Sequence, residues 1–420
     1  MRKCTDGKLK LQKGKILIMR RIILLFLIFS LTLGLCSCNS GDLSDIVSSL
    51  YDLLPQEEEI VEVKYEYFTI ENPRFSNCYK SLNSKQKEFY SRIYAISEEM
   101  TEGFVDVGKS YSNAVTDFSV AYNAFLYDNA EVFWMPNSYV LANAGSGAER
   151  KLAVAFSTTA DGRNKKYNVT KAQRDKYALQ LEKAVNKVLG AIKGMSEYEK
   201  ELYINDYICD NVTYKEKGGL VSTAYGALVQ KKALCEGYSR AFKLLCNKAG
   251  IECELIIGES DGVGHMWNRV NIDLKHSYVD VTWNDRAHKT YAYFNITDEQ
   301  LEKTHSFAPV LSSLTSEQIE KDEPYNFTKK TCSFTGNSYY EKKSLILWQE
   351  SSQKAADEID KALKKGDKQV EFMFATKEAL QLFESDPNVF ISKIQNEVKT
   401  AFINSYALER DVLILFFEKM

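Results

Sequence analysis

The chain has 420 residues, which is enough for two or three domains. Its formal net charge is -3, with acids and bases mixed along the chain, and no basic block has the footprint that neutralising phosphates requires, so the sequence argues against a nucleic-acid partner. Only six proline residues are present, which argues against long rigid linkers.

The amino-terminal segment predicts export. A basic pair precedes an apolar run over residues 22–35, which is typical of a secretory signal peptide and short for a membrane span. The run ends at two cysteines in a pattern that resembles a bacterial lipobox. Cys38 fits this pattern better than Cys36, because the small Ser37 precedes it whereas the bulky Leu35 precedes Cys36.

The lipobox resemblance implies cleavage before Cys38 and attachment of a lipid to its thiol. Residues 1–38 are then a signal peptide with a lipobox, and residues 39–60 are a flexible tether rich in polar and acidic residues. The alternative is an uncleaved signal anchor. We expect an exported protein that is lipid-anchored to the bacterial cell envelope or surface and meets the membrane through that lipid.

The region from 61 to 165 predicts an amino-terminal mixed α/β domain. Residues 61–67 alternate apolar and charged side chains, as a half-buried strand does. An amphipathic helix follows, and residues 131–136 and 151–157 have the composition of strands. No catalytic combination of side chains is visible in this region.

The region from 330 to 420 predicts a small carboxy-terminal α/β domain. Apolar residues favour strands over 368–374 and 412–417, and periodic apolar positions favour helices over 345–363 and 390–402. Helices that alternate with strands in this way pack as one small layered domain.

The region from 166 to 310 carries the side chains with chemistry. Cys235 opens a predicted helix that Gly250 ends. The unpaired N–H groups and the dipole at a helix amino terminus favour a thiolate there. The alternative interpretation is a buried cysteine that caps an ordinary core helix.

A predicted hairpin brings a histidine and an aspartate together. Strands over 265–272 and 275–283, joined by a two-residue turn, place Asp280 opposite Trp267 and make His265 its diagonal neighbour on the same face. An odd-length turn would place the two on opposite faces. The alternative for such a histidine is a surface residue or a satisfied core residue.

Three motifs, CEGYS from Cys235, HMWN-x-V from His265 and VDVTWN around Asp280, resemble in this order the transglutaminase-like superfamily. They are most similar to the branch whose members look like papain-fold cysteine proteases. The likeness is strong over residues 224–285 and weaker back to Tyr214. It implies an α+β fold, with a papain-like core whose cysteine-bearing helix packs on an antiparallel sheet, and mixed α/β flanking domains. The turn carries Asp-Leu where relatives often carry Asp-Gly.

The resemblance also implies roles. Cys235 would be the nucleophile, His265 the general base and Asp280 the residue that orients the imidazole, with the Cys235 N–H in an oxyanion hole. The Tyr225 hydroxyl either assists that hole or belongs to a packing aromatic. Trp267 and Trp283 form walls of the cleft or, as we favour, its core; the further polar candidates, favoured as structural, are His305, Asp261 and Glu236.

The predicted function is attack on a peptide or glutamine amide through a thioester, with protein or peptide substrates and without a cofactor. Hydrolysis is favoured; the alternatives are a cross-linking transglutaminase and a surface module that binds without catalysis. A metal site from Cys235, Cys246, Cys253 and a histidine is disfavoured, because the spacing matches no common ligand pattern.

Overall fold

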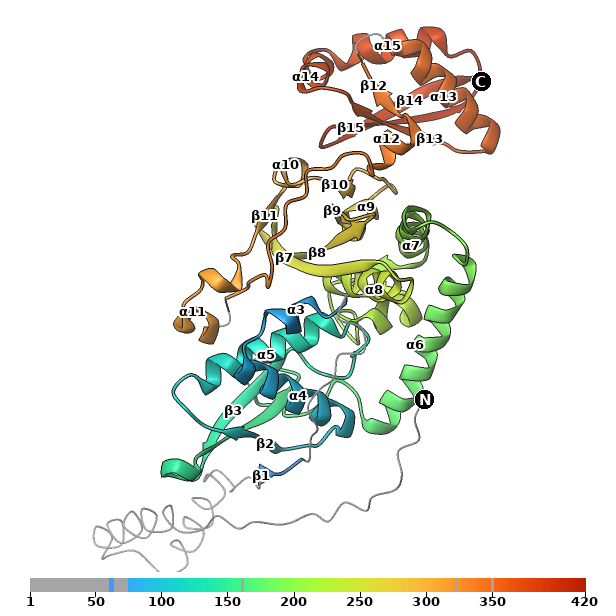
Figure 1. The fold of residues 1–420 in the computed structure, drawn as a ribbon. Helices are drawn as coiled ribbons and strands as arrows, with labels where there is room; N and C mark the ends of the chain where they lie inside the picture. Colours follow the sequence, from blue (N-terminus) through green and yellow to red (C-terminus); the bar gives the residue numbers. More distant parts are fainter. Residues whose placement is uncertain (1–59, 64–74, 160–161, 322, 349–350) are drawn as a thin grey trace, which may run out of the picture. The chain divides into compact units, whose positions relative to one another are not determined.

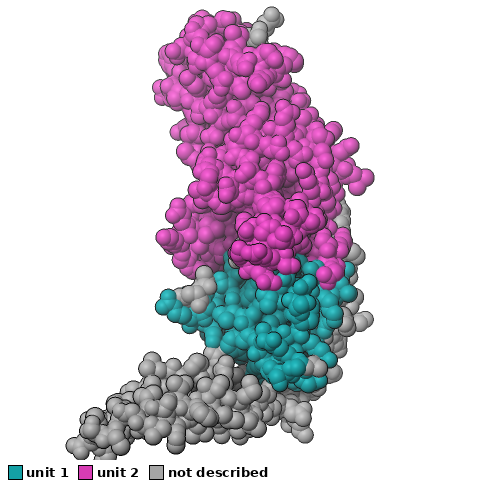
Figure 2. Space-filling view, turned by 90° about the vertical axis from the view of Figure 1, so that its left-hand side faces the viewer, with its two compact units in different colours: residues 1–69, 84–122, 134–170 teal, residues 70–83, 123–133, 171–420 magenta. Residues whose placement is uncertain are grey.

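The computed structural model describes residues 60–63, 75–159, 162–321, 323–348 and 351–420. The predicted signal peptide, the Cys38 lipidation site and nearly all of the tether lie outside these residues. Within the described residues, no helix is both long and apolar enough to cross a membrane. Contacts divide the chain into two units, shown in Figure 2: residues 1–69, 84–122 and 134–170, and residues 70–83, 123–133 and 171–420.

The first unit is built on a four-stranded sheet. Its strand order is β1 (Ile60–Val61), β2 (Phe104–Lys109), β4 (Lys151–Ser157) and β3 (Ser138–Ala144). Helix α4 (Ser84–Glu99) belongs to the same unit and buries Phe89, Ile93 and Ile96 at the period of a helix. The predicted strand over 151–157 is confirmed, and residues 64–67 of the strand predicted at 61–67 lie outside the described residues.

The strand predicted over 131–136 is wrong. The segment between α5 (Ala114–Asp128) and β3 is irregular although its side chains are almost all buried. Pro136 lacks the N–H that a sheet ladder needs, and the Tyr122 hydroxyl donates to its carbonyl. Apolar composition therefore marked a buried segment here, but not its backbone conformation.

From residue 171 onward, the second unit continues with two long helices, α6 (Lys171–Ala191) and α7 (Glu197–Asn211). Ser196 and Glu199 form a reciprocal capping box at the start of α7, which satisfies two of its otherwise unpaired N–H groups. Helix α8 (Cys235–Lys248) follows, after the two short parallel strands β5 (Thr213–Tyr214) and β6 (Lys232–Ala233).

A five-stranded sheet supports α8 (Figure 1). Its order is β10 (Phe294–Ile296), β9 (Lys275–Val279), β8 (Val263–Ile272), β7 (Glu252–Ser260) and β11 (His305–Phe307), with all neighbours antiparallel. Two buried hydrogen bonds fix α8 on β8: the Ser239 hydroxyl donates to the Met266 carbonyl at 2.8 Å, and the Asn268 amide donates to the Ser239 carbonyl at 3.1 Å. A helix on an antiparallel sheet confirms the predicted α+β class.

The predicted hairpin register is confirmed. Ile272 pairs with Lys275, so the turn consists of Asp273 and Leu274, both with positive φ. Strand β9 ends at Val279, however, and the prediction of a strand to residue 283 is wrong. The Asp280 side chain accepts the Trp283 N–H and caps the short helix α9 (Val281–Asn284), which ends the strand.

The carboxy-terminal part of the second unit holds another four-stranded sheet. Its order is β12 (Ile346–Leu347), β13 (Gln369–Phe374), β15 (Val412–Lys419) and β14 (Ala401–Glu409), with the helices α13 (Ser352–Lys365), α14 (Lys377–Ser385) and α15 (Pro387–Glu397). Both predicted strands are confirmed. The predicted helices have wrong bounds, since 346–347 form β12 and 401–402 belong to β14, which the sequence analysis missed together with α14.

A candidate thiol active site

A cleft of about 760 Å³ lies where α8, β8 and α9 meet in the second unit. Cys235 and His265 both line it. Its other lining residues are Val212, Thr213, Tyr214, Ser260, Asp261, Val263, Gly264, Thr282, Trp283, Asp285, Arg286 and Ala287. The three predicted motifs therefore converge on one cavity.

Cys235 is the first residue of α8 and is partly exposed. The residue before the helix, Leu234, makes no side-chain capping bond, and the thiol lies at the positive end of the helix dipole. Two residues on, Gly237 faces the Val221 carbonyl, which a Cβ would approach to 2.2 Å. The glycine in the CEGYS motif thus lets the thiol-bearing turn pack tightly against the preceding chain.

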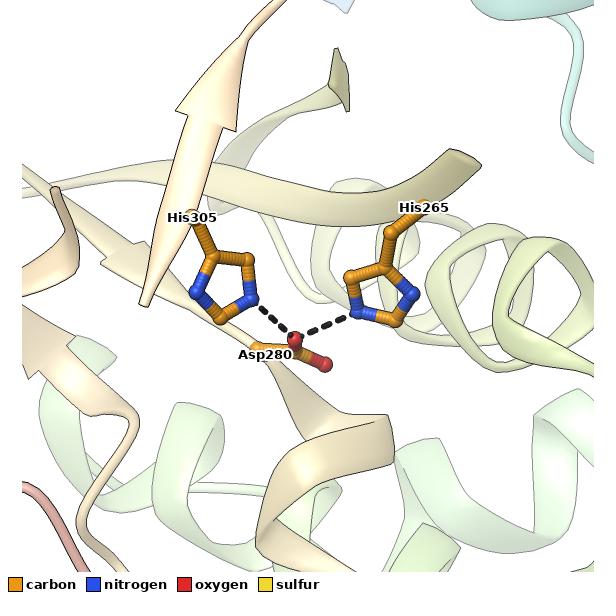
Figure 3. Close-up of side chains that lie close together, drawn as sticks. All are labelled: His265, Asp280 and His305. Atoms are coloured by element: carbon orange, nitrogen blue, oxygen red, sulfur yellow. Dashed lines mark hydrogen bonds and ion pairs between the residues drawn. The ribbon is translucent and has the colours of Figure 1, made fainter. Parts of the chain in front are cut away.

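His265 and Asp280 form a close pair in which Asp280 is buried and His265 is partly exposed (Figure 3). The His265 Nε2 lies 2.6 Å from the Asp280 Oδ2, and the Asp280 Oδ1 accepts the Trp283 N–H at 3.1 Å. Burial alone would lower the pKa of the His265 imidazolium, but the charge and hydrogen bond of the carboxylate, with a hydrogen bond to Cys235, raise that pKa to about 10.

The aspartate responds in the opposite direction. Burial alone would raise the pKa of Asp280, but the His265 charge and hydrogen bonds from His265 and His305 hold it well below its usual range. Because Nε2 of His265 is engaged by the carboxylate, Nδ1 is the nitrogen that can serve the Cys235 thiol. The structure thus brings Cys235, His265 and Asp280 together in that order.

The remaining residues proposed from the sequence lie in different places in the structure. Trp267 is fully buried beneath His265, with ring centroids 5.9 Å apart, whereas Trp283 lines the cleft and carries the Arg286 guanidinium 3.4 Å above its ring. The structure does not bring Tyr225 to this cleft, since it is not among the lining residues. Its hydroxyl donates to Gln180 at 2.6 Å.

The sequence analysis gave no functional role to two residues at or near the cleft, Tyr214 and His305. Tyr214 lines the cleft about half exposed, and burial, followed by the nearby Cys235 charge, raises the pKa of its hydroxyl. His305 contacts Asp280 from β11 and was interpreted as structural. A scarcity of histidines, four in the chain, was the one available signal.

One group of side chains among the described residues has the composition of a metal site. Donor atoms of His265, Asp280 and His305 lie within 4.8 Å of one another. Cys246 and Cys253 are instead buried next to each other. Every described cysteine is a free thiol.

Comparison with known proteins places this part of the chain in a family. The model of the transglutaminase-like superfamily matches residues 186–283. This segment belongs to the transglutaminase-like superfamily. The match contains Cys235, His265 and Asp280, and it ends within α9.

The individual proteins that the chain is similar to match only parts of it, at low identity. The chain is similar to the kyphoscoliosis peptidase of Mus musculus, at 29% identity over 105 residues that make up 21% of this chain and 16% of the peptidase. The Homo sapiens kyphoscoliosis peptidase is 29% identical over 94 residues, 18% of this chain and 14% of the peptidase. The chain therefore spans only a small part of these relatives. A crystal structure of a TGase is 20% identical over 36% of this chain and 45% of that chain, with a TM-score of 0.26.

Proposed function

We propose that this protein is a cysteine enzyme that cleaves amide bonds in proteins or peptides. The observation that carries the proposal is the 2.6 Å bond from the His265 Nε2 to the Asp280 Oδ2, which leaves the other ring nitrogen for Cys235 at the start of α8. A pKa of about 10 for His265 keeps the imidazole protonated at neutral pH, so the ring can hold the thiol proton.

The reaction follows from this proton placement. The Cys235 sulfur attacks the carbonyl carbon, and the carbonyl electrons move to an oxyanion that helix N–H groups can stabilise. His265 then gives its proton to the leaving nitrogen, the C–N bond breaks, and a thioester and a free amine result. Neutral His265 next takes a proton from water, whose oxygen attacks the thioester and releases Cys235 and a carboxylic acid.

Water is the acceptor we propose, because the two curated relatives are named peptidases. A lysine amine in place of water would give a cross-link, and a glutamine side chain in place of a peptide bond would give deamidation. We further propose, from the lipobox resemblance alone, that a lipid on Cys38 tethers the enzyme to the outside of a bacterial membrane.

The test uses the chain without its predicted signal peptide and lipidation site, from Asn39. Incubation with a proteome-derived peptide pool, followed by mass spectrometry, should give cleaved peptides with wild type and none with Cys235→Ala. Cys246→Ala is the matched control, since it removes a buried thiol from the same helix. This variant should keep the products of the wild type.

Each outcome assigns a function. Cross-linked or deamidated peptides would replace water by another acceptor or another amide while leaving the thiol mechanism intact. Equal products from the wild type and Cys235→Ala would contradict the proposal. No products from either, together with a Cys235 that resists alkylation, would favour a binding module.

A further inference from the structure

Asp280 is held by a second histidine. The Nε2 of His305 lies 3.1 Å from the Asp280 Oδ2, the same oxygen that the His265 Nε2 contacts at 2.6 Å (Figure 3). The side chains of His305 and Asp280 have no exposed surface. The two imidazoles therefore contact one buried carboxylate oxygen from β8 and β11, the two strands that flank β7 in the sheet.

The other ring nitrogen of His305 is also engaged. The Thr304 hydroxyl lies 2.8 Å from its Nδ1, whereas the Leu301 carbonyl is 3.4 Å from the same hydroxyl. Because the ionised Asp280 carboxylate can only accept, the bond to it requires a proton on the His305 Nε2. Thr304 thus contacts the ring nitrogen of His305 that does not face the carboxylate.

Aromatic rings enclose His305 on its other sides. The centroids of Trp267, Trp283 and Tyr293 lie 5.0, 4.7 and 5.8 Å from its ring. His305 does not line the cleft that contains Cys235. A side chain enclosed in this way has no path to a substrate, so it can act only through Asp280.

The backbone is shaped to bring His305 there. Strand β11 pairs with β7 and sets His305 opposite Ser260. At Gly258 the two strands come so close that a Cβ would lie 1.9 Å from the Ser306 carbonyl and 2.6 Å from the Trp267 ring. A side chain at residue 258 would push β11, and His305 with it, away from the carboxylate.

We propose that His305 is a positioning residue for the thiol enzyme. Its Nε2–H fixes the carboxylate of Asp280 against rotation, with Oδ1 held by the Trp283 N–H, so that Oδ2 stays aligned with His265. The aligned carboxylate holds His265 in its protonated, oriented form. This inference rests on the proposed function, because it assumes that His265 serves Cys235.

Two substitutions separate donation from packing. His305→Phe fills the ring volume without a donor, and His305→Gln places an amide N–H near the former Nε2. We expect His305→Phe to lower kcat on a cleaved peptide about 10- to 100-fold with KM within about twofold, as loss of a bond to a charged group implies. His305→Gln should restore most of kcat. His276→Gln, a histidine on β9 opposite Asn271, is the matched control and should match wild type.

A measurement without substrate keeps the two proposals distinguishable. The rate of Cys235 alkylation by iodoacetamide, followed across pH by mass spectrometry of its peptide, reports the proton shared with His265. His305→Phe should shift this profile, and Thr304→Val should shift it less in the same direction. A shifted profile with no Cys235-dependent turnover would support the role of His305 while removing the proposed peptidase.

Three results would overturn the inference. An unchanged kcat and an unchanged alkylation profile in His305→Phe would leave His305 with a packing role alone. An equal loss of kcat in His305→Gln and His305→Phe, with an equal fall in melting temperature, would again indicate packing. One equivalent of zinc in purified wild type, lost in His305→Gln, would show that His265, Asp280 and His305 are metal ligands. If His305→Phe fails to fold, the Gln and Val variants decide by the same profile.

Discussion

Two buried carboxylates of the second unit behave in opposite ways. Asp280, in the candidate active site, has a pKa well below its usual range. Glu201, on α7, is also fully buried, but burial raises its pKa to about 8, and the Asn295 amide, which donates at 2.7 Å, offsets this only in part. Burial, with a smaller contribution from the Glu197 charge, therefore favours the neutral form of Glu201.

The difference lies in the partners. Asp280 has the protonated His265 at 2.6 Å and further donors from His305 and Trp283. Glu201 has one neutral amide, and its Oε1 has no hydrogen-bond partner. A buried carboxylate is charged only where a cation and several hydrogen-bond donors offset the free energy of its lost hydration. The contrast shows that the surroundings of Asp280 stabilise its charged form, whereas those of Glu201 favour its neutral form.

The largest expected effect comes from the same acid-to-amide change at both positions. Asp280→Asn should lower kcat/KM by about 10³- to 10⁴-fold, since it removes the charge that orients and protonates His265. It should also move the alkaline limb of the pH–rate profile to lower pH, because the pKa of His265 is raised mainly by this carboxylate. Peptide cleavage measured across pH checks both effects.

Glu201→Gln is the matched control. It makes the same acid-to-amide change at a buried carboxylate on α7 that does not line the cleft, and should leave kcat/KM within about twofold. Equal losses of activity in the two variants would contradict the comparison and point to a general loss of folding.

The second prediction concerns stability and pH. The folded-state pKa of Glu201, about 8, lies above its unfolded value, so the folded protein retains a proton that the unfolded chain releases. Its stabilising effect is complete below about pH 4.3, and is lost as pH rises through 8. Urea denaturation should show stability falling over this window in wild type, by up to about 5 kcal/mol, and a flatter dependence in Glu201→Gln. Parallel pH dependences of the two proteins would contradict the assignment.

The sequence predicted much of the geometry of the candidate site for a simple reason. Side chains alternate along a strand, so a two-residue turn is enough to place His265 and Asp280 on one face of the hairpin. The helix that begins at Cys235 was equally predictable from the sequence, because Gly250 marks its end. Local rules of this kind fixed the three residues that lie within 46 positions of one another.

The sequence analysis failed where long-range contacts decide. His305 reaches Asp280 because β11 adds to the edge of the sheet beside β7, and nothing near residue 305 in the sequence indicates that pairing. Strand β9 ends at Val279 because the Asp280 side chain caps α9, which competes with the apolar pattern that continues to Trp283. Tyr225 turns to Gln180, a partner 45 residues away on α6.

The smallest expected effect comes from the turn that sets the hairpin register, which contains neither of the two carboxylates. Leu274 has a φ of 63° and is 87% exposed. Its left-handed backbone is strained for a residue with a Cβ, and the exposed side chain makes almost no packing contacts that offset the strain. Leu274→Gly should raise the free energy of unfolding by about 0.5–1 kcal/mol, after allowing for the greater freedom of glycine in the unfolded chain. Urea denaturation at pH 7 measures the change.

Leu274→Ala is the control for this turn, because it retains a Cβ and therefore the strain, and should gain little. Neither variant should alter kcat/KM, since the Ile272–Lys275 pairing that places Asp280 is unchanged. A gain in stability without a change in activity would show that the strain at Leu274 does not contribute to the alignment of His265 with Asp280. A loss of activity in Leu274→Gly would instead show that the strained turn contributes to the alignment of His265 with Asp280.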